Sequence, residues 1–126
     1  MVQGFEQRTC HRFEIPNGKL FYRGKRLFGW EKEYTPAHNL LNVSKGGASF
    51  ECNESFKPDQ RLIIKLVVPD DTHIEVFANV RWQRETSGFL KAVGVVFAPF
   101  GRGFNLNPPA ALDVLRRWDA KYVKVR

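Results

Sequence analysis

The sequence has few of the residues that build metal sites and disulfides. Its two cysteines, Cys10 and Cys52, belong to no C-x-x-C pair, and its three histidines are scattered along the chain. A structural zinc site needs closely spaced Cys and His ligands, and such spacing is missing here. We therefore expect two reduced thiols, no metal and no bound cofactor.

Long apolar runs are also missing. Residues 1–20 contain no apolar core of the kind found in signal peptides. No stretch of about 18 or more apolar residues is present, the length that a membrane-spanning helix requires. These absences predict a cytoplasmic protein that does not insert into a membrane.

Familiar catalytic patterns are absent as well. The chain has no G-x-S-x-G, H-E-x-x-H or phosphate-binding-loop sequence. His11, His38 and His73 have no convergent carboxylate in the sequence. The neighbouring Asp70 and Asp71 follow a proline, a pattern typical of a solvated turn. We expect a protein that is not an enzyme.

The chain has fewer acidic than basic residues. Lys and Arg total 20 against 13 Asp and Glu, which gives a formal charge of +7 and favours anionic partners. Of the 126 residues 43% are hydrophobic, with 11 Phe and 3 Trp. This composition supports one core and excludes two domains of ordinary size.

Short segments of strand character recur between polar turns. The strand segments are residues 13–15, 19–23, 48–52, 62–68, 74–82 and 90–97. In the longest, Ile74, Val76, Ala78, Val80 and Trp82 are predicted to share one face, and residues 83–88 then turn the chain. This spacing predicts an antiparallel barrel or sandwich.

The C-terminal segment changes to helical spacing. Asn107 followed by proline predicts the N-cap and first turn of a helix. Apolar residues at helical spacing then predict a face that packs on the sheet: Ala111, Leu115, Trp118 and Tyr122. The opposite side and the tail are basic: Arg116, Arg117, Lys121, Lys124 and Arg126.

Three stretches have residues suited to binding. Residues 40–50 contain Asn42, Ser44 and Gly47 in an N-x-S-x-x-G pattern, which fits either an ordinary Asx-type loop or a ligand site. Arg8 and Arg12 form an R-x-x-x-R pair in a segment without apolar periodicity, which we expect to be mobile until a ligand orders it. Guanidinium groups suit phosphate oxygens and the edge of guanine.

The third stretch is residues 21–34, where aromatic and basic side chains are interleaved. This pattern occurs in proteins that bind single-stranded nucleic acid. It also fits a twisted, half-exposed strand pair whose rings face the core.

The arginine pair followed by the N-x-S-x-x-G loop resembles the PilZ domain family of cyclic di-GMP receptors, which are bacterial second-messenger proteins. Residues 80–82 and 93–97 also agree with the usual sequence pattern of that family, so the resemblance extends from Arg8 to Phe97. It implies a six-stranded antiparallel β-barrel followed by a helix. The expected divisions are an arm at 1–12, the barrel at 13–106 and a helix with a basic tail at 107–126.

The resemblance also implies a site. Arg8 and Arg12 would clamp phosphates and guanine bases, Asn42 and Ser44 would hydrogen-bond a guanine edge or a phosphate, and Gly47 would let the ligand approach the backbone. The family has Asp or Asn where Asn42 stands, so the first polar group here is a neutral amide. The implied function is a cyclic di-GMP receptor that changes its surface and signals to a separate effector protein. Two alternatives stay open: a PilZ-like adaptor that binds no nucleotide, and a small basic barrel that binds single-stranded nucleic acid.

Overall fold

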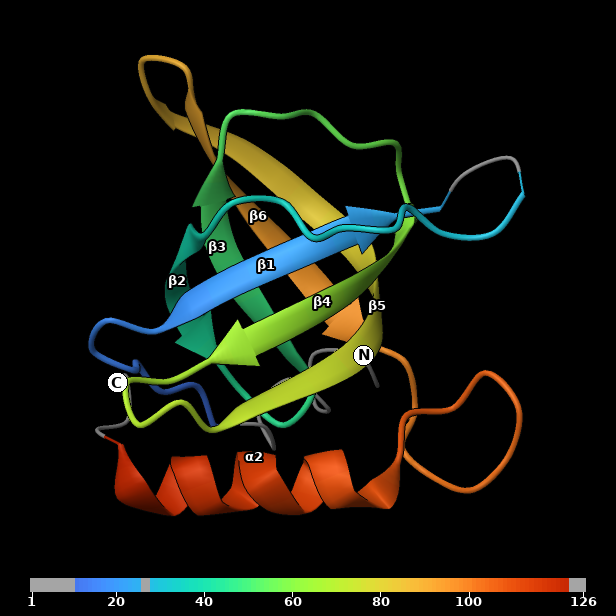
Figure 1. Cartoon of the computed structure of the whole chain (residues 1–126). Helices are drawn as coiled ribbons and strands as arrows, with labels where there is room; N and C mark the ends of the chain where they lie inside the picture. The colour runs from blue at the N-terminus through green and yellow to red at the C-terminus, as the bar shows by residue number, and fades with distance from the viewer. Residues whose placement is uncertain (1–10, 26–27, 123–126) are drawn as a thin grey trace, which may run out of the picture.

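The computed structural model describes residues 11–25 and 28–122, which form a closed antiparallel barrel and one helix (Figure 1). The elements are β1 (Lys19–Gly24), β2 (His38–Val43), β3 (Gly47–Cys52), β4 (Arg61–Val67), β5 (His73–Ser87), β6 (Leu90–Phe97) and α2 (Pro109–Lys121). Around the barrel the strands follow the order β1, β2, β3, β6, β5, β4. The predicted six-stranded antiparallel barrel with a C-terminal helix is confirmed.

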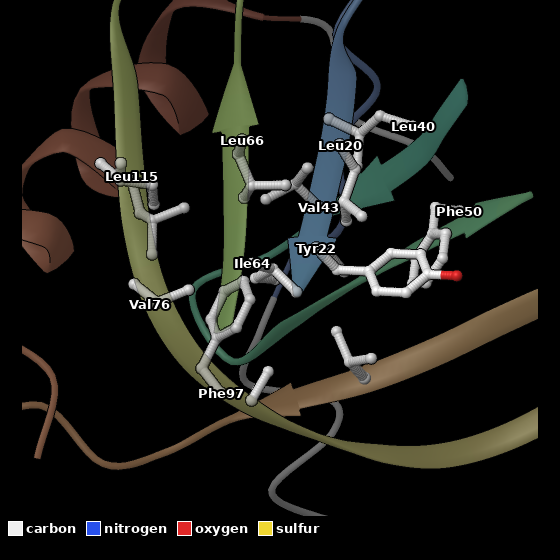
Figure 2. Packing of buried hydrophobic residues seen from close by; sticks show 14 of the residues in the cluster. Leu20, Tyr22, Leu40, Val43, Phe50, Ile64, Leu66, Val76, Phe97 and Leu115 are labelled. Atoms are coloured by element: carbon white, nitrogen blue, oxygen red, sulfur yellow. The ribbon is translucent and has the colours of Figure 1, made fainter. Parts of the chain in front are cut away.

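The core fills the barrel because inward and outward side chains alternate along each strand. In β4, Leu62, Ile64 and Leu66 are fully buried, while the residues between them are half-buried. Figure 2 shows Leu20, Ile64 and Leu66 from neighbouring strands pointing into the same interior. Each such side chain contributes about 1.5–3 kcal/mol when it is removed from water.

Strand β5 is longer than the sequence predicted. The predicted turn at 83–88 is wrong in most of its length, because β5 continues to Ser87 and pairs with β6 up to Leu90. A shift in register between Val80 and Trp82 marks a β-bulge. The extra residue reverses the alternation, so Trp82 leaves the inward face and is 41% exposed. The prediction that Trp82 shares a face with Val80 is therefore wrong.

Two other predicted segments are not regular strands. Residues 13–15 contribute one bridge, from Phe13 to Val43, before the chain turns. The described residues of 25–37 form an irregular loop with several bends and one bridge, from Lys25 to Trp30. There Trp30 packs on Phe77 with 6.0 Å between ring centroids. The hydroxyl of Tyr34 donates to Glu75 at 2.5 Å. The prediction that the rings of this strand pair face the core is wrong for both loop rings.

Burial and this hydrogen bond together raise the pKa of Tyr34 to about 12. Its phenol therefore keeps its proton at any physiological pH and stays a donor to Glu75.

Helix α2 lies across one end of the barrel (Figure 1). Ala111, Leu115 and Trp118 are buried on the side of α2 that faces the barrel, and Tyr122 packs beside them, as the helical spacing predicted. No helix within 11–25 or 28–122 is long and apolar enough to cross a membrane.

Asn107 is not the N-cap that the sequence predicted. Pro108 occupies that position without a side-chain hydrogen bond to the helix. Asn107 is fully buried instead, and its Oδ1 accepts from the backbone N–H of Phe77 at 2.7 Å. Its Nδ2 donates to the carbonyls of Phe77 and Ala98, both at 3.0 Å. One amide side chain thus ties the segment before the helix to β5 and to the end of β6.

We expect Asn107→Ala to lower the free energy of unfolding by about 3 kcal/mol, since it removes three hydrogen bonds and leaves the Phe77 N–H and the Ala98 carbonyl without partners. The Phe77 carbonyl still accepts from the Ala98 N–H. Urea denaturation of the variant measures this loss. Asn53→Ala is the control, because Asn53 is exposed and its removal should change stability by less than about 0.5 kcal/mol. Equal stability of the two variants would contradict the role given to Asn107.

Candidate functional site

The C-terminal end of the arginine segment is fixed next to the N-x-S-x-x-G loop. Phe13 is fully buried, and its backbone exchanges two hydrogen bonds with Val43, at 2.8 and 2.9 Å. Val43 lies between Asn42 and Ser44 in the chain. Arg12 is exposed and directly precedes Phe13, so it is held beside this loop. Arg8 lies outside the described residues.

Asn42 ends up on the outer face of the barrel. A register shift between Leu40 and Asn42 marks a bulge in β2, after which Asn42 pairs with Ser49 of β3. The Ser49 hydroxyl donates to Asn42 Oδ1 at 3.0 Å. Because its oxygen is engaged, Asn42 offers its amide nitrogen as the group that can donate to a ligand.

Ser44 shapes the turn at 44–46 that joins β2 to β3. Its side chain is buried, and its Oγ accepts from the backbone N–H groups of Gly46 at 3.1 Å and Gly47 at 3.2 Å. The Ser44 backbone N–H donates to the Gly47 carbonyl at 2.8 Å. This closes a compact turn of the kind that serine favours. Contact between Ser44 and a ligand stays a prediction.

Gly47 is needed for strand packing in this structure. A Cβ at this position would lie 2.2 Å from the carbonyl oxygen of Val95 in β6. The neighbour is backbone and cannot move aside without disturbing the β3–β6 pairing. The absence of a side chain thus has a structural cause, and its role in ligand approach stays a prediction.

A row of residues continues from Asn42 across the outer face. Asn42 pairs with Ser49, Ser49 with Gly94 of β6, and Gly94 with Trp82 of β5. The indole covers Gly94 so closely that a Cβ there would lie 2.2 Å from Trp82 Cε2. The guanidinium of Arg84 lies 5.3 Å from the Trp82 ring. This creates an outward aromatic platform bordered by a cation.

Sequence reasoning missed this platform. Two signals could have pointed to it: a glycine inside an otherwise apolar strand, which indicates a close approach, and the exposed half of a strand that is too long for the barrel. Neither signal locates the bulge that turns Trp82 outward.

The face has an unbalanced positive charge. Within the described part of the chain, the ion pairs are Arg116 with Asp113 and Lys121 with Asp70. Arg12, Lys45 and Arg84 therefore have no described carboxylate within ion-pairing distance. Two acidic residues border the face: Glu14 lies opposite Asn42 across the antiparallel Phe13–Val43 bridge, and Glu51 lies opposite Ala92. An anionic ligand is favoured here, and neighbouring aromatic and amide groups suit a flat ligand with hydrogen-bonding edges.

The aromatic and basic residues of 21–34 lie on another face, and most of their rings contact basic side chains of the protein itself. Arg23 lies 5.1 Å above the Tyr34 ring, and Lys65 lies 5.7 Å from the same ring. Phe77 is covered by Trp30 and by Arg61 at 5.5 Å. These rings already stack on the protein's own cations, which leaves them poorly placed to stack on nucleic-acid bases.

The described residues contain no group of three or more His, Cys, Asp or Glu side chains that could hold a metal ion.

The structure thus has a small closed barrel, a turn shaped by Ser44, an exposed Arg12 beside that turn and an outward face with polar and aromatic groups. The family model of the PilZ domain matches residues 6–103. The chain belongs to the PilZ domain family.

Solved structures share the fold. One is the complex of MrkH from K. pneumonia with c-di-GMP, with a TM-score of 0.62 at 13% identity, covering 87% of this chain and 48% of that one. Another is MotI/DgrA, an inhibitor of motility from Bacillus subtilis, with a TM-score of 0.59 at 17% identity, covering 91% and 52%. This chain thus spans about half the length of either protein, and at these identities the likeness shows the fold alone. A search of the curated proteins found no match.

We expect Gly47→Ala to lower the free energy of unfolding by about 1–3 kcal/mol, because the added methyl collides with the β6 backbone. Chemical denaturation measures the change. Gly24→Ala is the matched control, since a Cβ there meets Glu31 Oε1 at 3.6 Å and Gln60 Nε2 at 4.0 Å, which are ordinary contacts. A Gly47→Ala protein as stable as the Gly24→Ala protein would show that β3 and β6 can separate without cost.

Proposed function

We propose that this chain is a cyclic di-GMP receptor domain that binds its ligand on the outer face of β2, β3, β6 and β5. The observation that carries the proposal is the pair of backbone hydrogen bonds between Phe13 and Val43. These bonds hold Arg12 beside the N-x-S-x-x-G turn, in a chain of the PilZ family. The solved complex of MrkH with c-di-GMP has the same fold and supports the choice of ligand.

The chemistry of the ligand suits the groups on this face. Cyclic di-GMP has two phosphates and two guanine bases, so it presents anionic oxygens and flat rings with hydrogen-bonding edges. Arg8 and Arg12 bind phosphate oxygens or the guanine edge, and Asn42 donates from its amide nitrogen. Ser44 and Gly47 keep the turn open to the ligand, and Trp82 stacks on a base.

The signal in this proposal is a change of surface. The arm at 1–12 closes over the ligand and creates a new face that a separate effector protein recognises. Ordering a segment on binding costs roughly 2–5 kcal/mol of the interaction energy. We therefore expect micromolar affinity, which corresponds to roughly −8 kcal/mol.

Isothermal titration of the full chain with cyclic di-GMP tests the function. GTP and a short single-stranded oligonucleotide are the comparison ligands, each at two salt concentrations. Selective, saturable binding of cyclic di-GMP supports the receptor and gives the stoichiometry. No heat from a folded protein would favour the adaptor, whereas salt-sensitive binding of the oligonucleotide would favour the nucleic-acid barrel.

We expect Arg8→Ala and Arg12→Ala each to remove most cyclic di-GMP binding while the thermal unfolding curve is unchanged, because both arginines act on the ligand. Arg117→Ala is the control for lost positive charge, since Arg117 is exposed on α2. Unchanged affinity in both arm variants would refute the site, even if the protein binds cyclic di-GMP elsewhere.

Trp82→Ala should weaken cyclic di-GMP binding by about five- to 100-fold, as expected when one base loses an aromatic stacking partner. Phe89→Ala serves as the control, because Phe89 is 92% exposed near the tip of the same hairpin. Titration of both variants measures the difference. Equal affinities would mean that the Trp82 platform lies outside the binding site.

A further inference from the structure

Strands β1 and β4 have a regular pattern of side chains on their outer sides. Every second residue of each strand is buried in the core, and the residues between them point outward and are half-buried. The outward residues of β4 are Arg61, Ile63, Lys65 and Val67. Those of β1 are Lys19, Phe21 and Arg23. Figure 1 looks onto these two strands, with β3 and β6 behind them.

The register of the two strands arranges these side chains as a checkerboard. It places each basic residue opposite an apolar one: Lys19 with Val67, Phe21 with Lys65 and Arg23 with Ile63. Every cation therefore has apolar neighbours both across the strands and along its own strand. Like charges directly opposite one another would destabilise the pairing, and this register avoids them. We call this surface the checkerboard face.

The lysine at the centre of the checkerboard face has no ionic partner. Glu75 lies opposite Lys65 in the pairing of β4 with β5, but its carboxylate accepts from the Tyr34 hydroxyl. Lys65 Nζ lies 5.8 Å from the Phe21 ring and 5.7 Å from the Tyr34 ring, with no described carboxylate within ion-pairing distance. Glu33, in the adjoining loop, is exposed and forms no ion pair with a described residue.

The two arginines are held by uncharged groups of the protein. Arg23 donates to the carbonyl of Glu31 at 3.1 Å, and Arg61 donates to Asn79 Oδ1 at 3.4 Å. The Glu31 carboxylate accepts from the backbone N–H of Gly24 and forms no ion pair with either arginine. The guanidinium groups are thus positioned before any partner arrives, which lowers the cost of ordering them on binding.

The apolar members of the face are the second observation. The outward side of an antiparallel sheet is ordinarily polar where it faces water. Here Phe21, Ile63 and Val67 take outward positions between the cations and stay half-buried. A surface that mixes aromatic, aliphatic and arginine side chains has the composition of a protein–protein interface.

We propose that the checkerboard face binds an extended segment of another protein in which carboxylate and apolar side chains alternate on one side. Every second side chain of an extended segment points the same way, with the same spacing as the outward residues of β4. Carboxylates then lie opposite Arg61 and Lys65, and apolar side chains lie opposite Ile63 and Val67. This contact needs no cyclic di-GMP and lies away from the ligand face, so it goes beyond the receptor function.

Nucleic acid matches this face less well. Its phosphates could pair with the cations, but a phosphate backbone has no apolar groups to cover Phe21, Ile63 and Val67. The rings beside the face contact the protein's own cations, so bases have little free aromatic surface on which to stack.

Titration of the isotope-labelled full chain with a peptide at low salt, followed by two-dimensional NMR, tests the proposal. The peptide has Glu and Leu in turn at every second position, with Ser between them. It should bind saturably and shift the amide signals of β1 and β4. A peptide of the same composition, with its Glu and Leu residues in separate blocks, should bind about fivefold more weakly. A peptide with Gln in place of Glu should not bind, which tests the charge without altering the chain.

Arg61→Gln and Lys65→Gln should each weaken binding of the alternating peptide about three- to fivefold, the loss expected for one partly exposed ion pair. Arg117→Gln is the matched control, because it removes the same charge from an exposed position on α2. The cyclic di-GMP affinity of all three variants should equal that of the unaltered chain, which separates this surface from the receptor site.

The proposal is overturned if the alternating peptide shifts no signals of the folded chain, or if the shifts gather on β2, β3 and β6. Equal binding of the alternating and block peptides would overturn it, as would equal affinities of Arg61→Gln, Lys65→Gln and Arg117→Gln. An oligothymidylate of the same charge that binds β1 and β4 more tightly than the alternating peptide would assign the face to nucleic acid instead.

Discussion

Closure of the barrel is the constraint on which the rest of the structure depends. Each strand pairs on both sides, so β1 joins β2 to β4 and no edge along the cylinder stays unpaired. Closure fills the interior with alternating apolar side chains and leaves no room there for a ligand as large as a dinucleotide. Recognition must therefore occur on the outer face or at the two ends. Because α2 covers one end, the outer face and the opposite mouth are the surfaces that remain.

Two β-bulges bring the polar and aromatic side chains of the proposed site to the outer face. The bulge before Asn42 in β2 and the bulge before Trp82 in β5 each insert one residue and reverse the alternation. Both side chains thereby come to the outer face in a single row, linked by Ser49 and Gly94. Regular strands would have placed Trp82 in the core and removed the platform. The departures from ideal geometry thus fall where the proposed ligand binds, as expected when function rather than stability decides local structure.

Much of the fold could be predicted from periodicity, and the exceptions have a common cause. Residues 62–68 and 90–97 correspond to β4 and β6 closely, and the stripe from Ala111 to Trp118 packs as its spacing indicated. Trp82 was misplaced because a bulge is set by the partner strand, which local alternation does not reveal. Asn107 was taken for a cap because its partners, Phe77 and Ala98, meet it only after the barrel has closed. The position of Arg12 opposite Ser44 likewise depends on the non-local, antiparallel pairing of Phe13 with Val43. The resemblance to the PilZ family identified the candidate residues. Their arrangement in space could be described only from the folded structure.

The turn at 44–46 has a clear role in folding, whatever part it takes in the proposed binding. Ser44 Oγ is already engaged by the amides of Gly46 and Gly47, and Gly47 is already required by β6. The conformational cost of forming this loop is thus met during folding and not during binding. Arg12 is exposed and contributes nothing comparable to the core. Under the proposed function, damage to Ser44 or Gly47 therefore acts on stability first and on affinity through it, whereas damage to Arg12 acts on affinity alone. Loss of ligand binding identifies a contact residue in this family only when the free energy of unfolding has been measured beside it.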